Sequence, residues 1–333
     1  MYAPQDESHT SHQKDLKTTG QNEDCSQLTP DIYDNMLIDV PMSKFTWFRT
    51  GGKAKMMYQP TGELDLARLL RELQPDIQIL PIGIGSNLLV REGGYDGVVI
   101  RLSTQAFGKH RVLNDRQLEL GSGLPCKLVA KAALNAGIEG LSFLCGIPGS
   151  LGGALRMNAG GNGRETVDVL SLVHAVTRTG KRITLRPEQM NYRYRHCGAP
   201  KDLIFVSAVL EGVPGDRDEI RRQMDEVMRH REISHPSYSR TCGSTFKNPP
   251  GHSVWKLIDQ AGMRGARFGG AVVSTKHCNF LINEGTASPY DIEYLGETIR
   301  SRVLEATGVR LEWEVAIVGS FIEGREILPL GNG

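Results

Sequence analysis

The chain has 333 residues, with 39 Lys or Arg against 38 Asp or Glu, so its formal net charge is +1 with neutral histidines. This length predicts two or three domains with a sizeable buried core. Because the charges balance and no run of like charge occurs, the composition argues against nucleic acid or an anionic membrane surface as the main partner.

The apolar stretches are short and the amino-terminal end is polar. The longest apolar runs, in GVVIRL and DLIFVSAVL, fall far short of the roughly 20 residues that a membrane span needs. Residues 1–30 lack periodicity and the apolar core of a secretory signal, so we expect them to form a disordered extension. We therefore expect a soluble cytoplasmic protein without a membrane partner.

The six cysteines are scattered, with no CxxC pair and no partnered histidine spacing. Neither a metal site nor a disulfide framework is therefore predicted.

The first half of the chain shows two helical patterns and one strand. ELDLARLLREL (63–73) has leucines at helical spacing, and QILPIGIG after it predicts a strand that runs into glycines. LPCKLVAKAALNAG (124–137) repeats the helical pattern, and Gly137 lies at the expected stop position.

A hairpin and a further strand follow. VLSLVHAVTRTGKRITL (169–185) alternates and turns at Thr179-Gly180, which predicts two antiparallel strands. DLIFVSAVL (202–210) predicts another strand. Helices alternating with strands and hairpins indicate an α+β fold of mixed sheets.

The composition changes near residue 214, where we expect a domain boundary. A charged helix follows, with Ile220, Met224, Val227 and Met228 on one face. The last predicted helix begins at Ser288-Pro289 with a capping box closed by Asp291, and ends before Gly308. RLEWEVAIVG (310–319) is expected to return to the sheet as a strand.

Three glycine-rich loops are the most informative local feature: FRTGGKA (48–54), PIGIGSNLL (81–89) and GIPGSLGGALRMNAGG (146–161). Glycines allow positive φ and let consecutive N–H groups form a concave nest for anionic oxygens. Neither longer loop fits the common phosphate motifs, since Leu88 stands where the dinucleotide fingerprint has its third glycine and no GxxxxGK[ST] occurs. Either longer loop alone is better explained as a tight turn, but the two loops together with FRTGGKA favour a bound dinucleotide.

Seven segments in chain order resemble one family. FRTGG, GIGSNLLV, GLSFLCGIPGSLGGALRMNAGG, YRYRHC, CGSTFKNP, VSTKHCNFLIN and LEWEV are similar to segments of the UDP-N-acetylenolpyruvoylglucosamine reductase (MurB) family, over roughly residues 35–320. The resemblance implies an α+β fold with a vanillyl-alcohol-oxidase (PCMH) type FAD-binding domain and a C-terminal α+β substrate domain. By length, the chain resembles the shorter branch of the family.

The resemblance also implies domain limits. Residues 31–105 and 106–214 would form two FAD-binding subdomains. Residues 215–320 would form the substrate domain with a final strand returning to the sheet, and residues 321–333 a tail.

The family reaction is the NADPH-dependent reduction of UDP-N-acetylglucosamine enolpyruvate to UDP-N-acetylmuramic acid, a step of peptidoglycan precursor synthesis linked to cell shape and division. Hydride from reduced FAD N5 reaches the alkene carbon remote from the carboxylate, so negative charge develops beside the carboxylate. The site therefore needs cationic groups at that carboxylate and a proton donor at the charged carbon. The expected partners are FAD, NADPH and a small UDP-sugar, and the expected state is a monomer.

The resemblance assigns FAD binding to residues of the three glycine loops. These residues are Thr50, Gly51, Gly83, Ile84, Gly85, Ser86, Asn87, Leu88, Gly146, Ile147, Pro148, Gly149, Ser150, Gly153, Asn158, Ala159 and Gly160.

Three residues match the family's catalytic set. Ser244 would protonate the carbanion-like carbon, Arg195 would bind the enolpyruvyl carboxylate, and Glu314 would help to orient the reacting groups. Without its motif, Ser244 is better explained as a turn serine. If the segment is extended, Arg193 shares a face with Arg195, and a shift of register by two would exchange their roles.

The substrate contacts are a weaker part of the resemblance. Lys247, Asn248 and Arg231 match positions that contact the nucleotide sugar, and Lys256, Gln260 and His277 are further candidates. His277 is equally well explained as a structural histidine. Two departures are Ser234, where many members have lysine, and Trp313, where proline is common; we expect Trp313 to point away from the catalytic face.

Two other functions are compatible with this fold. One is a different flavin oxidase or dehydrogenase, because a fold does not fix a function. The other is a binding or regulatory protein that keeps FAD without catalysis. The motifs around Arg195, Ser244 and Glu314 disfavour both.

Overall fold

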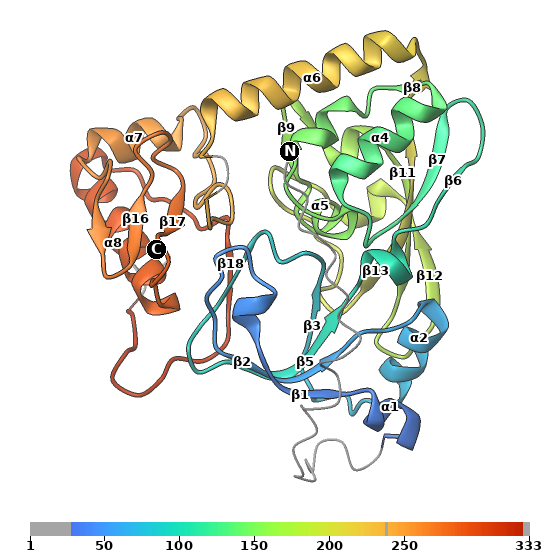
Figure 1. Ribbon diagram of the computed structural model, residues 1–333, viewed down its shortest axis with the longest axis horizontal. Coiled ribbons are helices and arrows are strands. Elements are labelled where there is room, and N and C mark those ends of the chain that lie inside the picture. Colours follow the sequence, from blue (N-terminus) through green and yellow to red (C-terminus); the bar gives the residue numbers. More distant parts are fainter. Residues whose placement is uncertain (1–27, 237–238, 329–333) are drawn as a thin grey trace.

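The computed structural model describes residues 28–236 and 239–328, which form three units around a common centre (Figure 1). The predicted extension falls mostly on residues 1–27 and the end of the predicted tail on 329–333, and both lie outside the described residues. In the described part, no helix has the length and apolar content needed to cross a membrane.

The first unit is a four-stranded sheet covered by one helix. Its strand order is β1 (Leu37–Pro41), β2 (Lys53–Tyr58), β5 (Tyr95–Arg101) and β3 (Ile79–Ile82). β1 is antiparallel to β2, and β2, β5 and β3 are parallel. The predicted helix is α2 (Glu63–Glu72), whose leucines at helical spacing are buried against the sheet.

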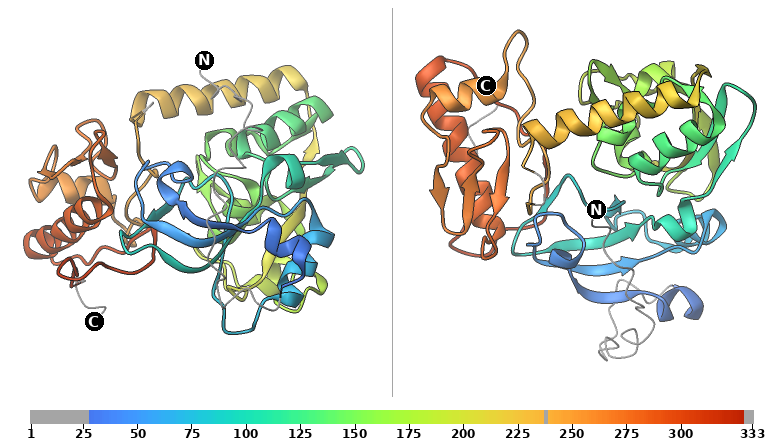
Figure 2. Two further views of the ribbon diagram at one scale, coloured as in Figure 1. Left: turned by 60° about the horizontal axis from the view of Figure 1, so that its bottom comes forward. Right: turned by 45° about the horizontal axis from the view of Figure 1, so that its top comes forward.

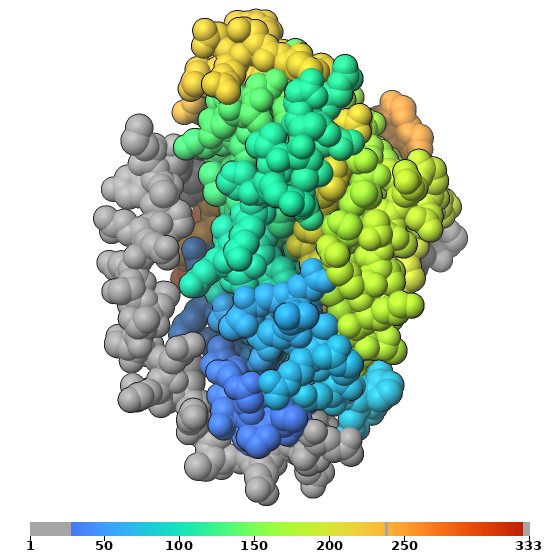
Figure 3. Space-filling model, turned by 90° about the vertical axis from the view of Figure 1, so that its right-hand side faces the viewer, coloured from blue at the N-terminus to red at the C-terminus, as the bar shows by residue number. Residues whose placement is uncertain are grey.

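The second unit is a five-stranded antiparallel sheet. Its order is β12 (Arg182–Leu185), β11 (Leu170–Val176), β13 (Ile204–Glu211), β7 (Gln117–Gly121) and β6 (His110–Val112). The predicted hairpin is confirmed: β11 and β12 pair antiparallel around Gly180, whose φ is +71°. Figure 3 shows that this unit and the first meet along a continuous surface.

Two helices of the second unit pack on its apolar core. They are α4 (Cys126–Ala136) and α5 (Leu151–Met157). The predicted stop at Gly137 is confirmed, because Gly137 caps α4 in the left-handed conformation.

The third unit begins with the long helix α6 (Arg217–Ser234), which passes from the second unit to the third (Figures 1 and 2). It is followed by α7 (Val254–Gln260), β15 (Arg267–Phe268), β16 (Ala271–Val273), β17 (Leu281–Asn283) and α8 (Pro289–Thr307). The capping box of Ser288 and Asp291 is present at the start of α8, and Gly308 ends the helix as predicted. The remaining short elements are α1 (Pro30–Asp34), α3 (Thr104–Phe107), β8 (Ile138–Glu139), β9 (Gly160–Gly161), β10 (Arg164–Glu165), β14 (Val213–Pro214) and four 3₁₀ turns, at Met42–Lys44, Ser142–Gly146, Thr166–Val169 and Pro187–Met190.

The carboxyl-terminal strand returns to the first unit but is shorter than predicted. β18 (Ala316–Val318) pairs in parallel with β4 (Leu88–Val90), which directly follows the 81–87 glycine loop. The preceding residues 312–314 are held instead by backbone hydrogen bonds to residues 245–247. Residues 244 and 314, which lie early and late in the sequence of the third unit, are thereby brought to the glycine loop.

Candidate active site

Two of the predicted glycine loops contact each other directly. The Ser86 hydroxyl donates to the Pro148 carbonyl oxygen at 2.8 Å. A Cβ on Gly83 would lie 2.0 Å from Ser150 Oγ, so no larger residue fits there without a shift. Segments more than 60 residues apart in the chain therefore form one surface.

The segment before the remaining glycine loop, residues 48–54, joins this surface. The Trp47 N–H donates to the Gly85 carbonyl oxygen at 3.0 Å. Gly85 has φ of +66°, and a Cβ there would lie 1.8 Å from the Phe45 carbonyl oxygen. Both the backbone conformation and the close approach require glycine. Within loop 48–54, the Thr50 carbonyl oxygen accepts a hydrogen bond from the Thr46 hydroxyl at 2.8 Å, and Gly51 has φ of +145°.

The loop surface presents backbone N–H groups without partners in the described part of the chain. No described residue accepts a hydrogen bond from the five consecutive N–H groups of residues 83–87, or from those of Gly149, Ser150 and Gly153. Consecutive free N–H groups form a nest for anionic oxygens such as those of a pyrophosphate. The loops therefore fit the dinucleotide that the sequence suggested.

A cavity of about 280 Å³ lies beside the two longer glycine loops. Eleven of the predicted site residues line it: Ser86, Asn87, Gly146, Ile147, Pro148, Ala159, Gly160, Arg195, Arg231, Ser244 and Glu314. The three predicted catalytic residues thus share one cavity, although they come from three separate parts of the chain.

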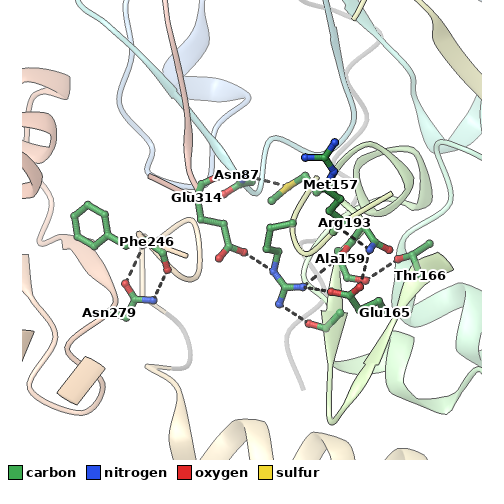
Figure 4. Close-up of polar contacts among 12 residues, drawn as sticks. Asn87, Met157, Ala159, Glu165, Thr166, Arg193, Phe246, Asn279 and Glu314 are labelled. Atoms are coloured by element: carbon green, nitrogen blue, oxygen red, sulfur yellow. Dashed lines mark hydrogen bonds and ion pairs between the residues drawn. The ribbon is translucent and has the colours of Figure 1, made fainter. Parts of the chain in front are cut away.

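Arg195 lies in a tight turn rather than in an extended segment. Arg193 and His196 exchange two backbone hydrogen bonds of 3.1 and 3.0 Å, and Arg195 has φ of +51°. The two arginines therefore do not share a face: Arg193 is exposed and outside the cavity lining, and Figure 4 shows its side chain apart from Glu314.

The Arg195 guanidinium is anchored at several atoms. Its Nε donates to Glu314 Oε1 at 3.0 Å, and its Nη2 donates to the Gly160 carbonyl oxygen at 3.0 Å. Only 16% of the Arg195 side chain and 13% of the Glu314 side chain are exposed. In such surroundings an ion pair is screened little by solvent.

Glu314 is held by its backbone as well as by its side chain. Its N–H donates to the Thr245 carbonyl oxygen at 2.8 Å, and its carbonyl oxygen accepts from Asn87 Nδ2 at 2.9 Å (Figure 4). Burial raises the pKa of the Glu314 carboxyl group, and the Arg195 cation opposes this rise. Asn87 thus connects a glycine loop to the charged pair.

Ser244 faces the same cavity from the third unit. The segment after it is fixed by Asn279, whose side chain exchanges hydrogen bonds of 2.8 and 3.0 Å with the Phe246 backbone (Figure 4). No described residue is hydrogen-bonded to the Ser244 hydroxyl, so this group is available to a ligand. Sequence reasoning missed Asn279, and its place inside the VSTKHCNFLIN motif was the one signal for it.

The predicted substrate residues are divided by the structure. Arg231 lines the cavity and donates to the Gly146 carbonyl oxygen, and burial lowers its pKa. Lys247 instead pairs with the exposed Glu312 at 3.3 Å, and Asn248 accepts from the Val254 N–H at 2.9 Å. These two residues, together with Lys256, Gln260 and His277, are absent from the cavity lining in the described part.

A histidine pair borders the cavity on the side of the third unit. His277 stacks on His235 with ring centroids 5.6 Å apart, and both rings lie nearly perpendicular to the Phe280 ring. His235 and Phe280 line the cavity. Burial is the main cause that lowers the pKa of His235 to about 4 and also lowers that of His277, so both rings favour the neutral form.

The remaining predicted positions have structural contacts. Leu88 is buried in β4. Asn158 is buried, and its amide group donates to Glu165 and to the Arg193 carbonyl oxygen. Trp313 packs against Phe246, away from the cavity as expected, and Ser234 donates to the His230 carbonyl oxygen. Among the described residues, no group of three or more His, Cys, Asp or Glu side chains could hold a metal ion.

Two family models match the chain. The model of the C-terminal domain of UDP-N-acetylenolpyruvoylglucosamine reductase matches residues 235–318, and that of an FAD binding domain matches residues 54–186.

The chain was also compared with solved structures. The chain is 33% identical to UDP-N-acetylenolpyruvylglucosamine reductase (MurB) from Thermus caldophilus, covering 84% of this chain and 97% of that one with a TM-score of 0.73. Chitooligosaccharide oxidase aligns at 18% identity, 53% and 38% coverage and a TM-score of 0.42. Berberine bridge enzyme from Eschscholzia californica aligns at 12% identity, 50% and 35% coverage and a TM-score of 0.39.

Proposed function

The chain belongs to the UDP-N-acetylenolpyruvoylglucosamine reductase family. Members of this family are FAD-containing oxidoreductases of peptidoglycan precursor synthesis that use NADPH. On this premise, we propose how the chain carries out the family reaction. It reduces the enolpyruvyl group of UDP-N-acetylglucosamine enolpyruvate to the lactyl ether of UDP-N-acetylmuramic acid. One observation carries the proposal: Arg195, Ser244 and Glu314 line a single cavity bordered by the glycine loops.

FAD binding is assigned to the glycine loops. The free N–H groups of residues 83–87 and of Gly149, Ser150 and Gly153 would hold the pyrophosphate. The clearance that Gly83 leaves beside Ser150 lets the backbone approach the ligand closely. When bound there, FAD would supply the hydride chemistry of the reaction, with NADPH as its reductant.

Arg195 binds the substrate carboxylate. Negative charge that develops on the carbon beside the carboxylate is delocalised into it, and a fixed guanidinium stabilises that charge more in the transition state than in the ground state. Its planar fork also suits a carboxylate ligand. The contacts to Glu314 and Gly160 hold the guanidinium at the cavity wall, so little reorganisation is needed during the reaction.

Ser244 donates its hydroxyl proton to the carbon beside the carboxylate and regains a proton from solvent. A serine hydroxyl is a weak acid, but an enolate carbon is a strong base, and correct placement supplies much of the remaining rate. Glu314 keeps Arg195 in place and helps to orient the reacting groups between Arg195 and Ser244.

The substrate's nucleotide is assigned to the third unit. Of the six candidate contacts, Arg231 has the best support because it lines the cavity. Lys247, Asn248, Lys256, Gln260 and His277 would need the substrate to extend beyond this cavity. We also propose that residues 31–105 and 106–214 form the FAD-binding part, that residues 215–320 form the substrate domain, and that the enzyme acts as a monomer.

An anaerobic visible spectrum of the purified protein tests the proposed function. The spectrum is recorded for the protein alone, then with NADPH, and then with UDP-N-acetylglucosamine enolpyruvate. The expected result is a flavin band that NADPH bleaches and that returns on addition of the enolpyruvyl substrate. A bleached band that only oxygen restores would instead indicate a different flavin oxidase of the same fold.

A further inference from the structure

Arg195 contacts a second carboxylate besides Glu314. Its Nη1 lies 3.8 Å from Glu165 Oε1, and 30% of the Glu165 side chain is exposed. Glu165 Oε2 in turn accepts a hydrogen bond of 2.7 Å from Asn158 Nδ2 (Figure 4). The guanidinium therefore lies between two carboxylates that come from β10 and from the segment before β18.

The backbone of Arg195 is in a conformation that needs support. Arg195 is the third residue of a four-residue turn and has φ of +51°, in the left-handed region where glycine and asparagine are favoured. Such conformations persist in other residues only when the surroundings fix them. From this turn the Arg195 side chain reaches the cavity lining.

Asn158 connects the turn to Glu165. It is fully buried, and its amide nitrogen donates both to Glu165 and to the Arg193 carbonyl oxygen, at 2.7 and 3.0 Å. Its amide oxygen accepts from the Val167 N–H at 3.0 Å. One side chain thus fixes the turn and the carboxylate together.

The backbone of Glu165 is held as well as its side chain. Its N–H donates to Asp168 Oδ2 at 2.7 Å in a capping box that begins the 3₁₀ turn Thr166–Val169. It also pairs with Gly160 across the two-stranded ribbon β9–β10, and the Gly160 carbonyl oxygen accepts from Arg195. A carboxylate fixed in this way defines where the Nη1 end of the guanidinium lies.

We propose that Glu165 is a positioning residue that aims the Arg195 guanidinium into the cavity, acting against Glu314 from the opposite side. Of the five N–H donors of Arg195, one each goes to Glu314, to the Asn158 carbonyl oxygen and to the Gly160 carbonyl oxygen. The two others are available to a ligand carboxylate. This inference rests on the proposed function, in which Arg195 binds the substrate carboxylate.

A double-mutant cycle on the FAD-loaded enzyme tests the role. Reduction by NADPH and reoxidation by the enolpyruvyl substrate are measured separately for the wild type, Glu165→Ala, Arg195→Ala and the double variant. We expect Glu165→Ala to slow reoxidation about a hundredfold, as a misplacement of about 1 Å does, and to change flavin reduction less than twofold. In the Arg195→Ala background it should change reoxidation less than twofold, because Glu165 acts only through Arg195.

Two further variants sharpen the cycle. Glu165→Gln keeps an acceptor for Asn158, so it should retain more reoxidation activity than Glu165→Ala. Glu119→Ala removes another glutamate paired with an arginine, Arg111 at 2.8 Å on β6 and β7, and should leave both half-reactions unchanged. Equal slowing of both half-reactions, or the same slowing with and without Arg195, would show that Glu165 is merely structural and would overturn the proposal.

A second readout needs no substrate. Hydrogen exchange of the Arg195 Nε–H is followed by NMR, with the resonance assigned by its loss in Arg195→Lys. We expect Glu165→Ala to speed this exchange at least tenfold and Glu119→Ala to leave it unchanged. If the substrate fails to reoxidise the wild-type flavin, the proposed function fails while the exchange rates still decide the positioning role; unchanged exchange in Glu165→Ala would refute it.

Discussion

Arg195 and Glu314 are 119 positions apart in the chain, and their side chains are joined by a hydrogen bond of 3.0 Å between Nε and Oε1. Both side chains are largely buried. Arg195 comes from a turn of the second unit, whereas Glu314 is brought in by backbone bonds to Thr245 and by the return of β18 to the first unit. The pair therefore forms only when all three units are assembled.

Replacing Arg195 should impair one half-reaction selectively. Arg195→Lys keeps the charge but loses the planar fork and the Nε–H that Glu314 accepts, so the two residues are not interchangeable here. We expect reoxidation by the enolpyruvyl substrate to fall about 10²–10³-fold, the usual effect of removing one charge-stabilising donor, with an increase in KM. Stopped-flow absorbance of both half-reactions measures this, and a variant impaired only in reduction by NADPH would contradict the role.

Glu314→Gln should make the protein more stable at neutral pH while it lowers activity. Because burial raises the folded-state pKa of Glu314, the stability linked to this group is present below its unfolded pKa of about 4.3 and is lost as pH rises through the folded pKa. The neutral glutamine avoids that loss. The Tm of the variant relative to wild type should thus increase from pH 4 to pH 8. The increase should be about 2–4 °C for each kcal/mol by which the difference in the free energy of unfolding grows.

Thermal unfolding of the flavin-loaded proteins at several pH values checks this prediction. A Tm difference that stays constant with pH would show that the two proteins do not differ in titration at this site. A difference that shrinks as pH rises would mean that the Glu314 pKa is lowered on folding.

Much of the fold can be predicted because its signals are local. The capping box at Ser288, the stop at Gly308 and the hairpin turn at Gly180 each depend on residues within a few positions, and the structure has all three. The glycine loop at residues 83–87 could also be predicted, because positions where the backbone approaches another group closely are occupied by glycine.

The details of the site depend on contacts between distant residues. If YRYRHC were extended, Arg193 and Arg195 would share a face, but the hydrogen bond from Asn158 to the Arg193 carbonyl oxygen stabilises a tight turn instead. Likewise, a motif can suggest that Lys247 meets a nucleotide, yet cannot reveal that Glu312 lies beside it in space. Glu165 and Asn279 were missed for the same reason.

Gly85→Ala should abolish flavin retention. A Cβ at this position would lie 1.8 Å from the Phe45 carbonyl oxygen, and the φ of +66° adds strain of about 1–3 kcal/mol. Gly62→Ala is the matched control, because no atom lies within 4 Å of its added Cβ. The ratio of flavin to protein absorbance after purification measures the effect; equal flavin content in both variants would contradict the assigned loop.

Gly296→Ala should destabilise the protein through one contact. Gly296 lies within α8, and a Cβ there would lie 2.0 Å from Cη2 of Trp313. In a Trp313→Ala background the same change should become stabilising by up to about 1 kcal/mol, since alanine is the better helix former. Urea unfolding of the four proteins tests the reversal of sign, and destabilisation by Gly296→Ala in both backgrounds would refute this packing.

The central claim is that Ser244 supplies the proton at the cavity shared with Arg195 and Glu314, and stopped-flow analysis of Ser244→Ala tests it most directly. The account predicts that NADPH bleaches the flavin of this variant at the wild-type rate, whereas reoxidation by UDP-N-acetylglucosamine enolpyruvate is about 10²–10⁴-fold slower. Reoxidation at the wild-type rate, or equal slowing of both half-reactions, would contradict it.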